Sequence, residues 1–73
     1  MGTSSGLHLP DVEKVSAKVH DAWMDTKRRQ HIRSRKSENG EELMVPYDEL
    51  SEDAKELDRQ TVRTVYAAIK SLV

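Results

Sequence analysis

The sequence predicts an all-α single domain, in which two long antiparallel helices are joined by a structured loop that contains a short extended piece or a helical turn. Two stretches in which apolar residues recur every three or four positions predict the helices. A non-periodic segment that ends in the turn signal Asn39-Gly40 separates them. At 73 residues the chain is near the lower limit for independent folding, so a partner, a second copy or a ligand can supply part of its stability.

Residues 1–10, "MGTSSGLHLP", lack periodicity and are rich in Gly and Ser. We expect them to be a disordered leader or a cloning remnant, and the domain to span residues 11–73. Asp11 follows Pro10 as a good N-cap, and the first helix should end at Arg28 or Arg29. Its apolar stripe consists of Val12, Val15, Val19, Ala22 and Trp23.

The middle of the chain is predicted to be a loop with a fixed exit. Pro46 disfavours a helical Val45 and lacks an N–H group, so "LMVPY" is at most a short extended piece, followed by one helical turn in "YDEL". Ser51 is the predicted N-cap of the second helix, which should run to about Leu72. The predicted core contains Val12, Val15, Val19, Ala22, Trp23, Leu43, Val45, Leu50, Ala54, Leu57, Thr61, Val65, Ile69 and Leu72.

Charge is segregated although the net charge is only -1. Six of the ten residues 27–36 are Lys or Arg, whereas residues 38–58 contain nine acids and one base. The basic run is either a solvated loop, an anion site for a phosphate or nucleotide, or a nucleic-acid surface. The few aromatic residues and the adjacent acidic block argue against nucleic acid.

Several other classes of function lack their sequence signals. There is no Cys, no apolar run long enough to cross a bilayer and no Gly-rich lysine loop for phosphate. His8, His20 and His31 lack metal-ligand spacing, and an EF-hand alignment on Gly40 would place Arg35 and Pro46 at ligand positions. We therefore predict no metal, no cofactor and no membrane segment, and a cytoplasmic location.

Residues across most of the chain resemble the RyR domain, the repeat of ryanodine receptor calcium-release channels that also occurs as small stand-alone bacterial and phage proteins. The resemblance rests on "VEKVSAKVHDAW" and "LMVPYDELSEDAKELDRQT" and covers about Val12 to Leu72. The family usually has a "GW..G" segment after the first helix. This chain instead has "QHIRSRKSENG", with no second tryptophan.

The resemblance implies a non-catalytic recognition or regulatory module, and it does not imply a calcium channel. We expect an anionic, nucleotide-like ligand, with Trp23 and Tyr47 meeting its ring and Lys27, Arg28 and Arg59 its charge. Pro46 would complete the site. Trp23, Pro46 and Tyr47 can equally serve only the fold. The alternative function is protein–protein assembly, through a homodimer or docking on a partner protein.

Two polar residues are predicted to be structural. A ring nitrogen of His20 can bond a backbone group of "VPYDEL" and pin that segment to the first helix. Asp58 belongs to an Asp58-Arg59 pair that either forms a structural pair or tethers the loop. Because no nucleophile, base or paired carboxylates stand in a supporting motif, the sequence does not predict an enzyme.

Overall fold

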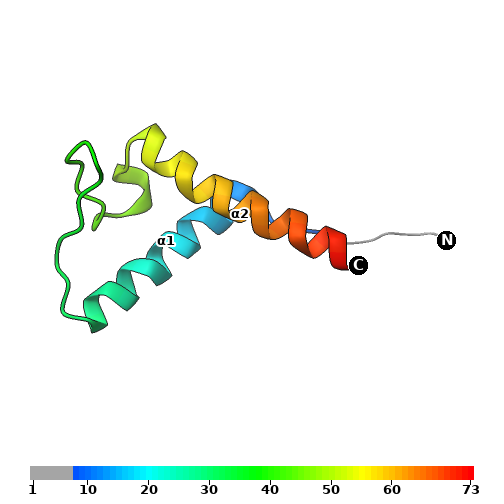
Figure 1. Ribbon diagram of the computed structural model, residues 1–73, viewed down its shortest axis with the longest axis horizontal. Coiled ribbons are helices and arrows are strands. Elements are labelled where there is room, and N and C mark those ends of the chain that lie inside the picture. Colours follow the sequence, from blue (N-terminus) through cyan, green and yellow to red (C-terminus); the bar gives the residue numbers. More distant parts are fainter. Residues whose placement is uncertain (1–7) are drawn as a thin grey trace.

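The computed structural model describes residues 8–73, which form two α-helices with a short 3-10 helix between them (Figure 1). Helix α1 spans Val12–Arg29, the 3-10 helix η1 spans Tyr47–Glu49, and α2 spans Glu52–Leu72. No β-strand is present among these described residues. The predicted all-α fold class is therefore confirmed. Residues 1–7 of the predicted leader lie outside the described part of the chain.

Helix α1 ends in a tight backbone motif. The N–H of His31 donates to the carbonyl of Arg28 at 2.9 Å, and the N–H of Ile32 donates to the carbonyl of Lys27 at 2.9 Å. This pair of bonds is the Schellman arrangement, in which the residue after the cap is left-handed. His31 occupies that position with a φ of 63°. The basic side chains of the last turn face the negative end of the helix dipole.

The loop turns back on itself at the predicted turn. Gly40 has a φ of 87°, and its N–H donates to the carbonyl of Ser37 at 2.9 Å. Lys36 and Glu42 then form an isolated antiparallel bridge, which is the extent of the pairing around the predicted extended piece. Pro46 leads into η1, and Ser51 caps α2 by accepting a hydrogen bond from the Ala54 N–H at 3.2 Å.

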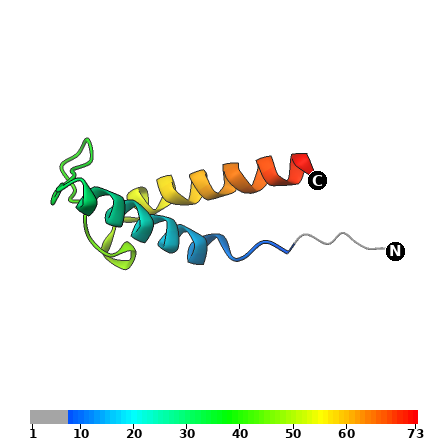
Figure 2. The same cartoon turned by 90° about the horizontal axis from the view of Figure 1, so that it is seen from below.

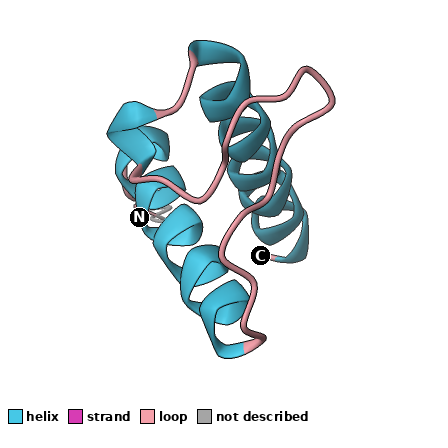
Figure 3. Cartoon of the chain, turned by 90° about the vertical axis from the view of Figure 1, so that its left-hand side faces the viewer, coloured by secondary structure: helices cyan, strands magenta, loops and turns pink. Residues whose placement is uncertain are grey.

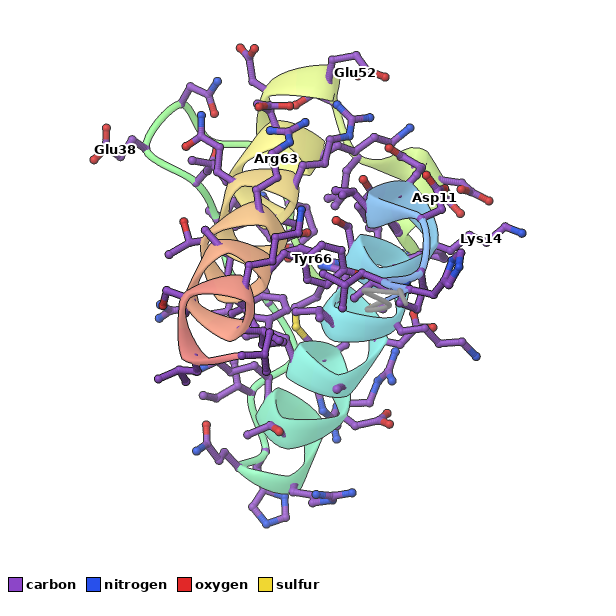
Figure 4. All side chains as sticks on the ribbon, turned by 90° about the vertical axis from the view of Figure 1, so that its right-hand side faces the viewer. Asp11, Lys14, Glu38, Glu52, Arg63 and Tyr66 are labelled. Carbon is purple, nitrogen blue, oxygen red and sulfur yellow. The ribbon has the colours of Figure 1, made fainter. Side chains whose placement is uncertain are left out.

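The helices run in opposite directions (Figures 1 and 2), and in the view of Figure 1 they spread apart toward the loop end. They are tied together where α1 begins, because the Tyr66 hydroxyl of α2 donates to the Pro10 carbonyl at 2.9 Å. Figure 4 shows Tyr66 between α2 and the start of α1. At the other end, the loop crosses the open side between the two helices (Figure 3).

The core is small and partly polar. Its buried side chains come from all three helices and from the residue after η1, namely Ser16, His20, Met24, Tyr47, Leu50 and Val62. Ser16 is fully buried one turn before His20, on the same face of α1. A small side chain at this position leaves room for the close approach of a neighbouring element.

The predicted core was wrong about one face of α2. Leu57, Val65 and Leu72 are 67%, 50% and 83% exposed, whereas Val62 is 2% exposed. Among the other predicted core residues, Val19, Ala22 and Thr61 are also exposed. Leu50 is buried as predicted, and the remaining members are half-buried, namely Val12, Val15, Trp23, Leu43, Val45, Ala54 and Ile69.

The core prediction failed on α2 because the face of α2 that meets α1, here called the inner face, carries charged residues that are paired. Asp58 lies beside His20, and Arg59 is paired with Glu13 of α1. A count of apolar residues alone therefore predicts that the opposite, outer face of α2, which carries Leu57, Val65 and Leu72, is the core face. The inner face nevertheless makes the contact with α1. Paired charges can be buried where isolated ones cannot.

Candidate functional site

A groove of about 850 Å³ lies between α1, the loop and α2. Its apolar lining comes from one face of α1, from the segment around η1 and from the first half of α2, and consists of Val19, Trp23, Leu43, Leu50, Ala54 and Leu57. Val19 and Leu57 are among the exposed large apolar side chains of the domain. An exposed apolar surface of this kind is typical of a site that binds a partner or ligand.

The polar rim of the groove is mainly acidic. Four carboxylates line it, namely Glu38, Glu41, Asp53 and Asp58, and Lys36 is the one Lys or Arg among its lining residues. The other polar lining residues are His20, Ser37, Asn39 and Thr61. Figure 4 shows Glu38 and Asp11 on either side of α2 in that view. An apolar groove with this rim favours an apolar occupant that does not bring further negative charge.

Two glutamates hold the loop in place as a wall of the groove. The Glu41 carboxylate accepts hydrogen bonds from the Ser51 N–H at 2.8 Å and from the Ser51 hydroxyl at 2.6 Å, which links the loop to the start of α2. These two bonds lower the pKa of Glu41.

Glu42 organises the loop internally. Its carboxylate accepts hydrogen bonds from the Ser34 hydroxyl, from the Arg35 N–H at 2.9 Å and from the Met44 N–H at 3.0 Å. These bonds, led by that from Ser34, lower the pKa of Glu42 to about 2. The loop therefore has a defined conformation next to the groove despite its lack of regular secondary structure.

His20 connects the groove to the buried face of α1. Its Nε2 lies 2.7 Å from the Val45 carbonyl oxygen, and Nε2–H is the donor because a carbonyl can only accept. Val45 belongs to "VPYDEL", the segment in which the sequence predicts a backbone partner for His20. The ring stacks on Trp23 with centroids 5.5 Å apart and is tilted toward Tyr47 at 6.2 Å. This arrangement fixes the indole that lines the groove.

The second ring nitrogen of His20 faces an acid on α2. Nδ1 lies 3.6 Å from an Asp58 carboxylate oxygen. Partial burial raises the pKa of Asp58, and the nearby imidazole opposes this shift. Asp58 therefore joins α2 to α1 through His20, and both residues line the groove.

Arg59 lies outside the set of groove-lining residues. Its guanidinium makes a two-point contact with Glu13, with Nε and Nη2 at 2.7 and 3.1 Å from the carboxylate oxygens. Nη1 also donates to Glu52 at 3.1 Å and to Glu56 at 3.5 Å. Glu13 first, and then Glu52, raise the pKa of Arg59, and the guanidinium in turn lowers the pKa of Glu13. The contacts of Arg59 thus join the beginning of α1 to α2.

The six residues predicted to meet a ligand do not share one surface. Trp23 lines the groove, and the Lys27 ammonium lies 6.0 Å from the centre of the Trp23 ring. Arg28 is exposed and paired with Asp25 at 3.1 Å, and Pro46 is exposed beside η1. Tyr47 and Arg59 do not line the groove. The structure therefore brings together two pairs of this set, Trp23 with Lys27, and Tyr47 with Arg59, whose guanidinium influences the pKa of Tyr47.

Tyr47 is a core residue, with 4% of its surface exposed. Its hydroxyl has no hydrogen-bond partner among the described residues, and the Lys55 ammonium lies 5.6 Å from its ring centre. Burial is the largest cause of its raised pKa, followed by the influence of Glu13. Its ring is tilted against the His20 ring, with the ring centroids 6.2 Å apart.

Sequence reasoning assigned Val19, Leu43 and Leu57 to the core, and these residues instead line the groove. For Leu57, the signal that could have placed it on a surface is the surplus of apolar positions on α2, where two different faces each carry apolar residues. Lys36, Ser37 and Asn39 also line the groove, and they lie in the segment where this chain lacks the "GW..G" pattern.

Comparison with known proteins decides the family. The model of the RyR domain family matches residues 8–72, which is nearly the whole chain. The chain belongs to the RyR domain family. The match begins at residue 8, so it includes the last residues of the predicted leader. Searches of curated proteins and of solved structures gave no match.

This RyR domain shows neither of two features within residues 8–73. None of the helices in this part of the chain is both long enough and apolar enough to cross a membrane. In the same described range, no group of three or more acidic, His or Cys side chains is placed to hold a metal ion.

Proposed function

We propose that this RyR domain is a non-catalytic protein-interaction module whose groove binds an amphipathic helix of a partner protein. The observation that carries the proposal is the exposed apolar lining of the groove, with Leu57 67% exposed at its edge. A helix that lays its apolar face into such a groove removes this surface from water.

The rim restricts the chemistry of the helix. Four carboxylates and one lysine surround the apolar lining, so acids beside the apolar face of the incoming helix would be repelled. Basic or neutral residues in those positions are compatible with the rim. The module therefore selects an amphipathic helix whose apolar stripe is flanked by basic or neutral residues.

Trp23 provides a direct test because it is the only tryptophan and it lines the groove. The full chain is titrated with two designed amphipathic helical peptides of equal length and equal apolar face, one with lysine flanks and one with glutamate flanks. We expect saturable change of the Trp23 fluorescence with the lysine peptide and weaker binding of the glutamate peptide. Equal binding of both, or binding of neither, would contradict the proposal.

A matched pair of variants places the binding in the groove. Leu57→Glu introduces a charge at the groove edge and should abolish the fluorescence change, whereas Ala67→Glu introduces the same charge at an exposed position of α2 outside the groove lining. Both positions are exposed, so neither variant should alter the circular dichroism of the free domain. Equal loss of binding in the two variants would mean that the groove is not the site.

A nucleotide-like anion is the second candidate, and one observation favours it. Trp23 offers an indole face in the groove, and the Lys27 ammonium lies 6.0 Å from its ring centre, so a planar anion could stack and meet a cation together. The acidic rim opposes this ligand. Titration with nucleotides and cyclic dinucleotides at low salt tests it with the same fluorescence signal. Saturable binding that Lys27→Ala removes would replace the first proposal by this one.

A further inference from the structure

We infer that the helix received by the groove is α2 of a second copy of this chain, paired antiparallel and reciprocally. This inference rests on the proposed function, whose partner it names. It is carried by the outer stripe, which we define as Leu57, Thr61, Val65, Ala68 and Leu72, and by the distribution of charge along α2.

The outer stripe is a continuous surface without a partner among the described residues. Its members follow one another at steps of three or four, so they lie on one face of the helix. All five are exposed, and Leu72 is 83% exposed. With 1.5 Å of rise per residue, the stripe is about 22 Å long. Exposed apolar surface that continues over several turns marks an interaction site.

The stripe extends past the groove. Leu57 and Thr61 are groove-lining residues, but Val65, Ala68 and Leu72 are not. A short helix bound in the groove would leave these three exposed. A second α2 lying along the whole stripe covers them all, because each copy offers a stripe of the same length.

Charge selects the antiparallel direction. Residues 52–59 contain four acids and two bases, which gives a net charge of about -2, whereas residues 60–72 contain only Arg63 and Lys70, about +2. A parallel pair would set the two acidic halves against each other. An antiparallel pair sets each acidic half against the half without acids. It also directs the two helix dipoles in opposite senses, which is the favourable arrangement.

The register follows from the stripe. When two stripes are laid antiparallel with full overlap, Leu72 of one copy lies opposite Leu57 of the other, and the two Val65 side chains lie nearest the two-fold axis. Leu72 of each copy then enters the groove of the other near Val19, Trp23 and Leu57. The contact is the same on both copies, so it closes as a dimer and does not propagate.

Association is measured first, with the full chain. We expect sedimentation equilibrium to show a reversible monomer–dimer transition. Val65→Asp should weaken the association by about a hundredfold or more, because the two-fold axis applies the substitution twice near the centre of the interface. Ala67→Asp, at an exposed position off the stripe, should leave the association unchanged. A chain that stays monomeric at every concentration tested overturns the inference.

Disulfide cross-linking tests the direction, since the natural chain has no cysteine. Val65→Cys should oxidise to one covalent dimer, and a mixture of Leu57→Cys with Leu72→Cys should give the mixed dimer. Leu72→Cys alone and Ala67→Cys alone should not cross-link above background. A dimer in which Leu72→Cys links to itself as well as it links to Leu57→Cys is parallel, and it overturns the inference.

The two proposals fail in different ways. If the lysine peptide binds the groove while the chain sediments as a monomer, the interaction module stands and the second copy is wrong as its partner. If the chain dimerises but Leu57→Glu leaves the dimer intact, association occurs through another surface, and the groove is not involved. If neither the peptide nor a second copy binds, both proposals are wrong.

Discussion

The two faces of α2 differ in the contacts that they make with the rest of the domain. The inner face contains the buried Val62. It also contains Asp58 and Arg59, which make polar contacts with α1, and Tyr66, which donates to the Pro10 carbonyl just before α1. The outer stripe has more apolar residues but contacts little, and Leu57 and Leu72 are largely exposed. The comparison teaches that the more apolar face of a helix in a small domain need not be its core face. In this RyR domain the extra apolar face is the exposed one.

The largest expected contrast comes from the same substitution on the two faces. Val62→Asp places an unpaired charge at a side chain that is 2% exposed, and we expect a loss of on the order of 3–5 kcal/mol in the free energy of unfolding. Val65, three residues later, is 50% exposed, so Val65→Asp should change the free energy of unfolding of the monomer by no more than about 0.5 kcal/mol.

The measurement is urea denaturation followed by circular dichroism, at a protein concentration low enough for the chain to be monomeric. Similar losses for the two variants would mean that Val65 is covered in the free monomer. The distinction between a structural and a binding face of α2 would then be wrong.

How far the sequence predicts the structure depends on which of these faces is considered. The helix bounds follow from local signals, because the Ser51 cap, the turn at Gly40 and Pro46 act over a few residues. The helical turn at "YDEL" is also found, as η1. These features require no knowledge of what packs against what.

The choice of face on α2 could not be predicted in the same way. It depends on pairs that are distant in the sequence, such as Arg59 with Glu13, 46 residues apart. An arginine in the sequence is ordinarily predicted to be a surface residue, so the apolar pattern alone predicts the outer stripe as the core face. The apolar pattern also predicts Val19, Leu43 and Leu57 as core residues, whereas Val19 and Leu57 are exposed and all three line the groove.

The second prediction concerns the contact between the inner face and the groove. His20→Ala removes the donor to the Val45 carbonyl and the stack on Trp23, and it leaves a partly buried acceptor without a partner. We expect a loss of about 2–4 kcal/mol in the free energy of unfolding. His8→Ala, at an exposed histidine, should have little effect in the same denaturation experiment. A loss below about 1 kcal/mol for His20→Ala would show that this contact does not hold the inner face.

The third prediction is smaller and concerns the start of α2, where the loop is attached. Ser51→Ala removes the side-chain cap of the helix and one of the two hydrogen bonds to Glu41. The expected loss is about 1 kcal/mol, the usual value for an N-cap. Ser71→Ala, near the other end of the same helix, should cost within about 0.5 kcal/mol. Equal thermal shifts for the two variants would contradict a role for Ser51 in joining the loop to α2.

The fourth prediction uses pH to distinguish the unfolding of the groove wall from the unfolding of the inner face of α2. The pKa of Glu42 is about 2 in the folded domain, compared with an ordinary value of 4.5. The unfolded chain therefore takes up the proton at a higher pH than the folded one, and the stabilisation that Glu42 gives is present above about pH 4.5 and is lost as the pH falls toward 2. Glu42→Gln should make the free energy of unfolding less dependent on pH in this range. Glu38→Gln, an exposed glutamate of the same loop, should not.

The signal of Trp23 then shows which part of the domain loosens first. Glu42 bonds only within the loop, to Ser34, Arg35 and Met44, so its protonation should release the groove wall before the helices separate. We expect the Trp23 fluorescence to change at a higher pH than the helical circular dichroism in the natural chain, and the two transitions to move together in Glu42→Gln. Coincident transitions in the natural chain would mean that the groove wall and the paired inner face of α2 unfold as one unit.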